Sequence, residues 1–320
     1  MREPTAARDR EQRAAGVIDT LSAGYATINR HPWIIAVPVL LDLFLWLGPR
    51  LSPAPLVQRT LGRVQVPVGL SADLLEAYQG SREGLLRVGE SFNLLSLLAS
   101  HFPGIPSLMS TKEGVGVPIP VSEPWVALGL LLLIPAVGIW LASVYYATIG
   151  QQVRRESEGI GQLHGRIWRI WRRLLGFLLL LIGGGLLVGG PLTVLALVTG
   201  MASTAILGFM MAVVWVVALW LQFYLFFVVD AIVISDVGPI DAIRNSVAVV
   251  RSNLPSTAGL VVLIWLIMLG MPIVWDAIAR STPGTLVGIL GNAYISTGLA
   301  VASMTYYKDR FATLQRRAEG

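Results

Sequence analysis

The chain has 320 residues, of which 54% are hydrophobic and 13% are charged, and its formal net charge is +5 at pH 7. Soluble globular proteins carry about 25% charged residues, so this composition excludes an ordinary soluble protein and indicates a membrane protein. The chain has no cysteine, which excludes disulfides and thiolate metal sites. Its basic residues are scattered through the segments that flank apolar stretches, so we do not expect nucleic-acid binding.

The first predicted element is a cytoplasmic amphipathic helix within residues 1–32. Its apolar side chains recur at helical spacing and end at Pro32. They are Val17, Leu21, Tyr25 and Ile28. Residues 33–48 follow as the first membrane span, which is short because a helix needs about 20 apolar residues to cross a bilayer.

The long connection 49–124 is predicted to form an extracytoplasmic helical cap. Connections longer than about 15 residues usually carry structure or function of their own. Two helices are expected, 71–79 and 81–100, because each opens on a serine that can cap it and carries an acid in its first turn. A ligand-binding lid is the alternative, but no polar residues converge enough to indicate a ligand.

Five further apolar stretches are long enough to cross a bilayer. The second span is 125–149, the third and fourth lie within 174–229, and the fifth and sixth lie within 257–306. The predicted fold class is therefore all-α, a polytopic transmembrane helix bundle with about six spans and a tail at 307–320.

Arginine and lysine set the predicted orientation, because cytoplasmic loops are enriched in both. The basic residues favour the side that holds 1–32, 150–173, 230–256 and 307–320. Both termini are therefore predicted to be cytoplasmic, in a multi-pass protein of the cell membrane. A positive inner face would also attract the anionic lipids of the cytoplasmic leaflet.

The segments 150–173 and 230–256 are predicted to lie as helices in the cytoplasmic interface of the membrane. In the second segment, Asp236 is expected to cap a helix whose apolar stripe faces the membrane, with arginines on the opposite face. The stripe consists of Ile240, Ile243, Val247, Val250 and Leu254.

These two segments supply the candidate residues for binding lipid headgroups or a protein partner. Tryptophan suits the headgroup level of a membrane, and arginine suits its anionic groups. The candidates are Arg166, Trp168, Arg169, Trp171, Arg172, Arg173, Arg244 and Arg251. The alternative is that these helices only anchor and orient the spans.

Four polar side chains fall inside the predicted spans, where ionisable groups are costly and often functional. They are Asp42, Gln222, Asn292 and Tyr294. Asp42 could carry protons, hold a cation or accept hydrogen bonds as a structural carboxyl, and the structural interpretation is favoured. The other three are expected to form interhelical hydrogen bonds. Asp230 and Asp276 lie at span ends, where we expect them to reach water.

No metal ion or cofactor is predicted. The topology puts His31 and His164 on the inner side and His101 on the outer side, so the three histidines cannot share one ion. The sequence also lacks a phosphate-binding glycine loop, a serine nucleophile elbow and a zinc-protease helix.

Two pairs of glycines have the spacing that lets helices approach closely. Gly185 and Gly189 form one pair, and Gly284 and Gly288 form the other. Both pairs are predicted to be packing faces rather than parts of a gate.

Three stretches carry a resemblance to a known family. "INRHPWIIAVPVLL", "DVGPIDAIRNSVAVVRSN" and "TYYKDRF" resemble segments of uncharacterised bacterial membrane proteins related to the membrane domain of glycerophosphoryl diester phosphodiesterases. The residues that fall on these patterns are Ala242, Ser246, Arg251, Tyr307, Asp309 and Arg310. Val247 stands where the family has a large aromatic residue. The resemblance implies a membrane module that lacks the soluble hydrolase domain.

The function predicted from these observations is non-enzymatic. The protein would bind lipid, or organise a partner, through its cytoplasmic interfacial helices. The alternative is a transport permease subunit, since "IDAIRNSVAVVRSNLP" loosely resembles the coupling loop of importer permeases, or a proton-coupled carrier that uses Asp42. A lipid-modifying enzyme is a third interpretation, which would need an acid, a base and a nucleophile at one depth.

Overall fold

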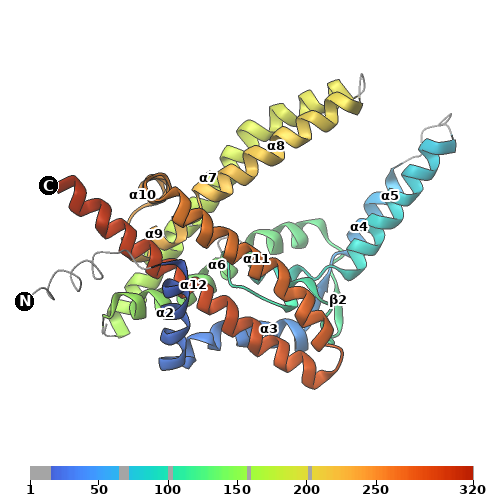
Figure 1. Cartoon of the computed structure of the whole chain (residues 1–320). Helices are drawn as coiled ribbons and strands as arrows, with labels where there is room; N and C mark the ends of the chain where they lie inside the picture. Colours follow the sequence, from blue (N-terminus) through green and yellow to red (C-terminus); the bar gives the residue numbers. More distant parts are fainter. Residues whose placement is uncertain (1–15, 65–71, 100–103, 157–159, 201–203, 320) are drawn as a thin grey trace, which may run out of the picture. The chain divides into compact units, whose positions relative to one another are not determined.

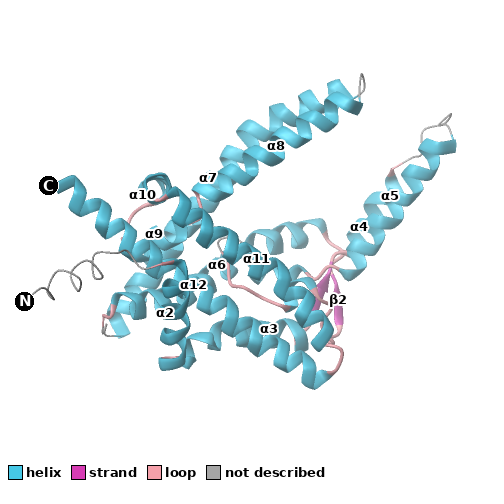
Figure 2. Ribbon diagram, in the orientation of Figure 1, coloured by secondary structure: helices cyan, strands magenta, loops and turns pink. Residues whose placement is uncertain are grey.

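The computed structural model describes residues 16–319, apart from 65–71, 100–103, 157–159 and 201–203. The described chain is almost entirely helical, with one pair of short strands (Figure 2). Residues 1–15 of the predicted N-terminal helix lie outside the described residues, as do Ser71, Ser100 and His101.

The elements follow one another along the chain as labelled in Figure 1. The first part comprises α2 (Val17–Arg30), η1 (Pro32–Ile35), α3 (Ala36–Leu47), β1 (Arg50–Ser52), α4 (Ala54–Arg63), α5 (Ala72–Ser91), η2 (Leu94–Ala99), η3 (Met109–Thr111) and β2 (Pro118–Pro120). The second part comprises α6 (Pro124–Arg154), α7 (Ile160–Gly200), α8 (Thr204–Tyr224), α9 (Val228–Ile234), α10 (Pro239–Ser252), α11 (Leu254–Ile278) and α12 (Thr282–Glu319).

The chain divides into two compact units, to which α6, α11 and α12 each contribute a part. The first unit is Met1–Ile34, Tyr146–Met271 and Ile295–Gly320, and the second unit is Ile35–Tyr145 and Pro272–Tyr294. Three of the four chain boundaries between the units therefore fall inside α-helices, and the fourth falls inside the short helix η1.

Among the described residues, five helical stretches are long and apolar enough to cross a membrane. A sixth span is present only if α2 and the η1–α3 segment count as one bent span. The five stretches are Pro124–Arg154, Gly161–Ala196, Ala205–Ile234, Leu254–Ile278 and Thr282–Arg317. The chain is therefore an all-α, multi-pass membrane protein, which confirms the predicted fold class.

Of the six predicted spans, the first, at 33–48, differs most from its prediction. The helix α3 has 12 residues, which gives about 18 Å at 1.5 Å per residue, whereas the hydrocarbon core is about 30 Å thick. Pro32 and the η1 turn separate α3 from α2. The segment is therefore too short to cross a bilayer by itself.

The basic segment 150–173 is not the separate helix that the sequence predicted. The helix α6 runs to Arg154, and α7 continues for 41 residues without a break from Ile160 to Gly200. A helix of this length spans about 60 Å, twice the hydrocarbon core. The arginine-bearing turns of α7 are therefore the direct extension of a membrane-spanning helix.

In the first unit, α2 packs on α12 through glycine. A Cβ on Gly24 would lie 2.7 Å from the carbonyl oxygen of Gly298, so only glycine allows this approach. The Tyr25 hydroxyl donates to the carbonyl of Ile295 at 3.4 Å, and Ile28 is buried. The apolar stripe predicted for this helix is thus its packed face, and it contacts protein.

In the second unit, β1 and β2 pair in parallel, and α4 packs against α5 as a helical hairpin (Figure 1). The helices predicted at 71–79 and 81–100 are replaced by the single helix α5, followed by η2. Gly80 lies inside α5, and no described atom outside its own helix backbone lies within 4 Å of where a Cβ would stand. It therefore does not end the helix, although its propensity is low.

The glycine pairs behave differently from each other. A Cβ on Gly288 would lie 3.1 Å from the side chain of Leu108, which confirms close packing there. A Cβ on Gly284 would meet the carbonyl of Ile278, in the tight turn between α11 and α12. Around Gly185 and Gly189, in contrast, no described atom outside their own helix backbone lies within 4 Å of the Cβ position, so the packing face predicted for them is wrong for the part of the chain that the structure describes.

This difference gives a direct test of the α2 contact. Gly24→Ala should lower the melting temperature of the purified protein, because overpacking a tight contact costs about 1–3 kcal/mol. Gly189→Ala should leave it unchanged or slightly raised, since alanine is the better helix former. Thermal unfolding of both variants in one detergent makes the comparison. The α2 contact is misassigned if Gly24→Ala melts no lower than Gly189→Ala.

Candidate functional site

The predicted basic residues of α7 gather in the first unit, where Glu156 forms the first ion cluster. Both terminal nitrogens of Arg166 lie 3.3 Å from Glu156 Oε2. Arg154, at the end of α6, places its Nε 3.5 Å from the same oxygen, and its Nη1 donates to the carbonyl of Ile234. The Glu156 carboxylate therefore joins the end of α6 to the start of α7.

Asp236 forms the second ion cluster with two arginines one turn apart on α7. Arg169 Nη2 lies 3.6 Å from Asp236 Oδ2, and Arg173 hydrogen bonds to Asp236 Oδ1. The backbone of Asp236 has φ 51, an uncommon conformation for a residue other than glycine. The clusters hold α7 against the segment that enters α10.

The prediction that Asp236 caps α10 is wrong. The N-cap is Gly238, and no side chain caps the helix end. Asp236 lies two residues earlier and points its carboxylate at α7, because two guanidinium groups offer stronger hydrogen bonds than a neutral backbone amide.

The pKa of Asp236 follows from this environment. Partial burial raises the pKa, but the hydrogen bond from Arg173 and the positive charges of Arg173, Arg169 and Arg166 outweigh it. The net result is a pKa below the ordinary value of 3.8. A carboxylate with a depressed pKa stabilises the fold at higher pH, and this stabilisation is lost as pH falls through the folded-state pKa.

Of the remaining candidates on α7, Trp168 and Arg172 are exposed and Trp171 is half-buried. Trp168 and Trp171 stack with their ring centroids 4.7 Å apart, and Trp168 is 47% exposed. Arg172 is exposed, and it takes part in no ion pair among the described residues. At the basic end of α7, Arg166, Arg169 and Arg173 therefore form ion pairs with acids, whereas Arg172 does not.

On α10, the face that packs against other helices shares only Val250 with the predicted apolar stripe. Ala242, Ser246, Val249 and Val250 are buried, whereas Ile240 of the predicted stripe is 58% exposed. Small residues form the packed face because α10 lies close against α9, α7 and α8.

The two arginines of α10 are on its exposed surface. Arg244 lies 3.3 Å from Asp241 of its own helix. Arg251 makes no ion pair with any residue that the structure describes. No described contact joins these arginines to those of α7, so the eight predicted candidates do not form one site.

Ser246, one of the family-pattern residues, bridges the break between α8 and α9. Its hydroxyl donates to the carbonyl of Tyr224 at 2.7 Å and accepts from the amide of Phe227 at 3.1 Å. These are backbone groups that the interrupted helix leaves unsatisfied. Ser246 is completely buried, so its role in this arrangement is structural.

The closing residues of the pattern attach α12 to its neighbours. Tyr307 is buried and hydrogen bonds to Ser235 at 2.8 Å. Arg310 donates to Ser256 at 3.2 Å, and its guanidinium carbon lies 5.0 Å from the ring centroid of Tyr306. Asp309 is exposed beside them.

Asp230 is a buried acid whose position was wrongly predicted from the sequence. It is 6% exposed rather than open to water, and its Oδ2 accepts a 2.5 Å hydrogen bond from Ser303. The unbroken apolar run around it in "FFVVDAIVI" is the signal that could have indicated burial.

The four polar candidates in the predicted spans differ in burial and do not form one site. The Asp42 carboxylate accepts hydrogen bonds from the Ser107 hydroxyl and from the amides of Leu108 and Met109, at 3.0 and 3.1 Å. These bonds connect α3 to η3 and support the structural interpretation of Asp42. The other three candidates are less buried: Gln222 is exposed, which contradicts its predicted burial, and Asn292 and Tyr294 are half-buried.

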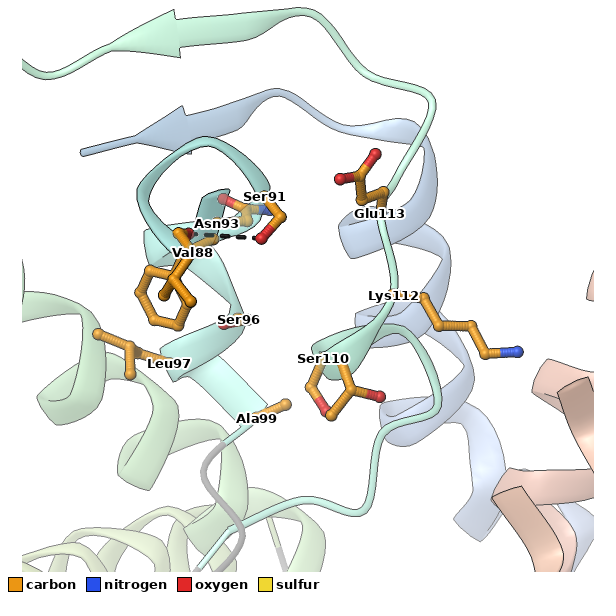
Figure 3. A pocket seen from close by; sticks show the side chains of 11 residues that line it. Val88, Ser91, Asn93, Ser96, Leu97, Ala99, Ser110, Lys112 and Glu113 are labelled. Atoms are coloured by element: carbon orange, nitrogen blue, oxygen red, sulfur yellow. Dashed lines mark hydrogen bonds between the residues drawn. The ribbon is translucent and has the colours of Figure 1, made fainter. Parts of the chain in front are cut away.

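A cavity of about 370 Å³ lies in the second unit, between the end of α5, η2 and the segment 110–113. Figure 3 shows that Lys112 points away from this cavity, and its Nζ lies 2.7 Å from Asp276. Glu113 pairs with Arg50 at 3.7 Å. Because both charged groups are engaged by ion pairs, the cavity offers hydroxyl and amide groups but no available charge.

No group of three or more metal-binding side chains comes together within the described part of the chain. His164 is exposed on α7, and His31 is half-buried at the end of α2.

The fold and these sites define a polytopic α-helical membrane protein with an arginine-rich end to its first unit. Residues 16–306 match the family model described as "Domain of unknown function (DUF7847)". The chain therefore belongs to this family. No curated protein and no solved structure matches it. The resemblance to the membrane domain of glycerophosphoryl diester phosphodiesterases stays a prediction.

The Asp236 cluster gives a test with a defined pH dependence. Asp236→Asn should lower the melting temperature at neutral pH by a few degrees, because Arg169 and Arg173 lose their shared carboxylate. The gap to the unmodified protein should close as pH falls through the depressed pKa, below 3.8. Thermal unfolding at a series of pH values measures this gap. A gap that is constant from neutral to acidic pH would contradict the ion cluster.

Proposed function

We propose that this protein is a non-enzymatic component of the cell membrane that binds anionic lipid headgroups through the exposed arginines of its first unit. The proposal includes the relation to glycerophosphoryl diester phosphodiesterase membrane domains, as a module that binds lipid without hydrolysing it. The observation that carries it is the stacked pair of Trp168, which is exposed, and Trp171, which is half-buried, beside the exposed Arg172.

This pair lies where α7 passes from charged turns to an apolar span. Tryptophan rings are most stable at the headgroup level, with an apolar body and a polar N–H. An exposed arginine at the same level is attracted to anionic lipid by about 1 kcal/mol. Together they support contact between this end of α7 and the membrane surface.

The surface of α10 supports the same contact. Ile240 and Arg244 are four residues apart and share one exposed side of the helix. An exposed apolar side chain beside an exposed arginine is typical of a helix that lies in the interface. We define the lipid-facing surface as Trp168, Arg172, Ile240, Arg244 and Arg251.

A test of this surface is the variant Arg172→Gln, Arg244→Gln and Arg251→Gln. These arginines make no ion pair between elements, so the melting temperature should stay unchanged while retained anionic lipid falls severalfold. Lipid retained by the purified protein is counted by native mass spectrometry.

The matched control removes the same charge elsewhere, with Arg59→Gln, Arg63→Gln and Arg82→Gln. These residues lie on α4 and α5 of the second unit, and the control should retain as much lipid as the unmodified protein. Equal lipid content in the two triple variants would count against the proposal.

The proposed orientation, with both termini cytoplasmic, requires an even number of spans. Since five stretches qualify alone, the proposal needs α2 and α3 to complete a sixth crossing together. The absence of cysteine makes labelling direct. Single cysteines at Ala248, Gln315 and the N-terminus should react with an impermeant maleimide on the same side of sealed vesicles. An N-terminal cysteine labelled from the opposite side would show an odd number of spans.

A further inference from the structure

A second cavity in the first unit, of about 380 Å³, lies between the ends of two helices. Thr27, Arg30 and His31 line it from the end of α2, and Gln152, Arg155 and Glu156 line it from the end of α6. All six side chains are polar or charged. None of them belongs to the lipid-facing surface, so binding in this cavity would be independent of lipid binding at that surface.

The two arginines that line this cavity form no ion pair with a described acid. Arg30 and Arg155 make no ion pair or side-chain hydrogen bond among the described residues. This distinguishes them from Arg154 and Arg166, which both hold Glu156.

The single acid in the lining is already neutralised. Glu156 faces Arg154 at 3.5 Å and Arg166 at 3.3 Å, so it does not compete for Arg30 and Arg155. The carbonyl ends of α2 and α6 add about half a negative charge each, which is less than the two free guanidinium groups supply. The cavity therefore has an excess of positive charge.

Arg155 has a further distinguishing feature in its backbone. Its φ of 59 is in the left-handed region, at the position after a helix where glycine is usual. A side chain in this conformation costs roughly 1 kcal/mol or more and persists only where the surroundings determine it. Glycine would serve the turn better, so the turn alone does not explain an arginine at this position.

We propose that this cavity binds a phosphate group, with Arg30 and Arg155 as paired guanidinium donors from two elements and Thr27, His31 and Gln152 as neutral hydrogen-bonding groups around them. Arginine matches phosphate geometry because its planar fork donates two parallel hydrogen bonds. The phosphate belongs to a lipid headgroup or to a soluble phosphate ester.

The decisive variant is Arg155→Gly, because it removes the guanidinium and favours the turn. It should melt at the same temperature as the unmodified protein or higher, so a loss of binding cannot be ascribed to unfolding. Arg30→Gln removes the other donor. Each should weaken phosphate binding roughly tenfold or more, since each loses hydrogen bonds to a charged group.

The experiment uses the full chain in nanodiscs of zwitterionic lipid, with two probes. Inorganic phosphate is titrated while thermal stability is recorded, and separate nanodiscs include phosphatidic acid, whose retention is counted by native mass spectrometry. A response to inorganic phosphate that both variants lose supports a soluble phosphate ester. A loss in both variants of the phosphatidic acid that the triple variant at Arg172, Arg244 and Arg251 still retains, without a response to inorganic phosphate, supports a lipid headgroup.

The control is Arg82→Gln, an exposed arginine of α5, which should leave both readouts unchanged. The proposal is overturned if neither probe binds, or if Arg155→Gly and Arg30→Gln bind both probes as tightly as Arg82→Gln does. Arg155→Gly should still retain the anionic lipid that depends on Arg172, Arg244 and Arg251. Failure of this site is therefore distinguishable from failure of the lipid-facing surface.

Discussion

The pairing of Glu156 and Asp236 with the arginines of α7 decides which cations of the first unit remain available to a ligand. Arg166, Arg169 and Arg173 lie within ion-pair distance of these two acids, as does Arg154 at the end of α6. Such ion pairs stabilise the fold most where they are partly buried, because salt screens buried pairs less than exposed ones. The paired arginines connect α6, α7 and the entry to α10, and the unpaired ones define the surfaces that we assign to lipid and to phosphate.

The residues of the family pattern belong to the same framework. Ser246 satisfies two backbone groups at the α8–α9 break, and Tyr307 and Arg310 fasten α12 to the α9–α10 connection and to α11. A backbone group left unsatisfied within a membrane costs several kcal/mol. In this structure, these residues hold the helices together.

The sequence predicted the long apolar helices well, because a backbone in lipid must satisfy its own hydrogen bonds and therefore forms continuous apolar helices. It also predicted the packed face of α2 from the spacing of Val17, Leu21 and Tyr25, since helical periodicity depends only on local geometry. It failed where the partner lies far away in the chain. Asp236 looked like a local cap but binds arginines about sixty residues earlier, and Asp230 is buried against Ser303. Glycine spacing was equally ambiguous, because Gly185 and Gly288 look alike in the sequence, and only Gly288 has a close neighbour, the side chain of Leu108.

The most direct measurement of this account is a double-mutant cycle between Asp236 and Arg173, with Asp236→Ala, Arg173→Ala and the double variant compared by thermal or denaturant unfolding. If Asp236 and Arg173 form a stabilising ion pair, the effects of the two single substitutions on the free energy of unfolding should be non-additive by about 0.5 kcal/mol or more. The same cycle between Asp236 and Arg172 should be additive. Additivity within about 0.3 kcal/mol in both cycles would show that Asp236 interacts no more strongly with Arg173 than with Arg172. That result would contradict the claim that ion pairing with Asp236 decides which arginines of α7 remain available to a ligand.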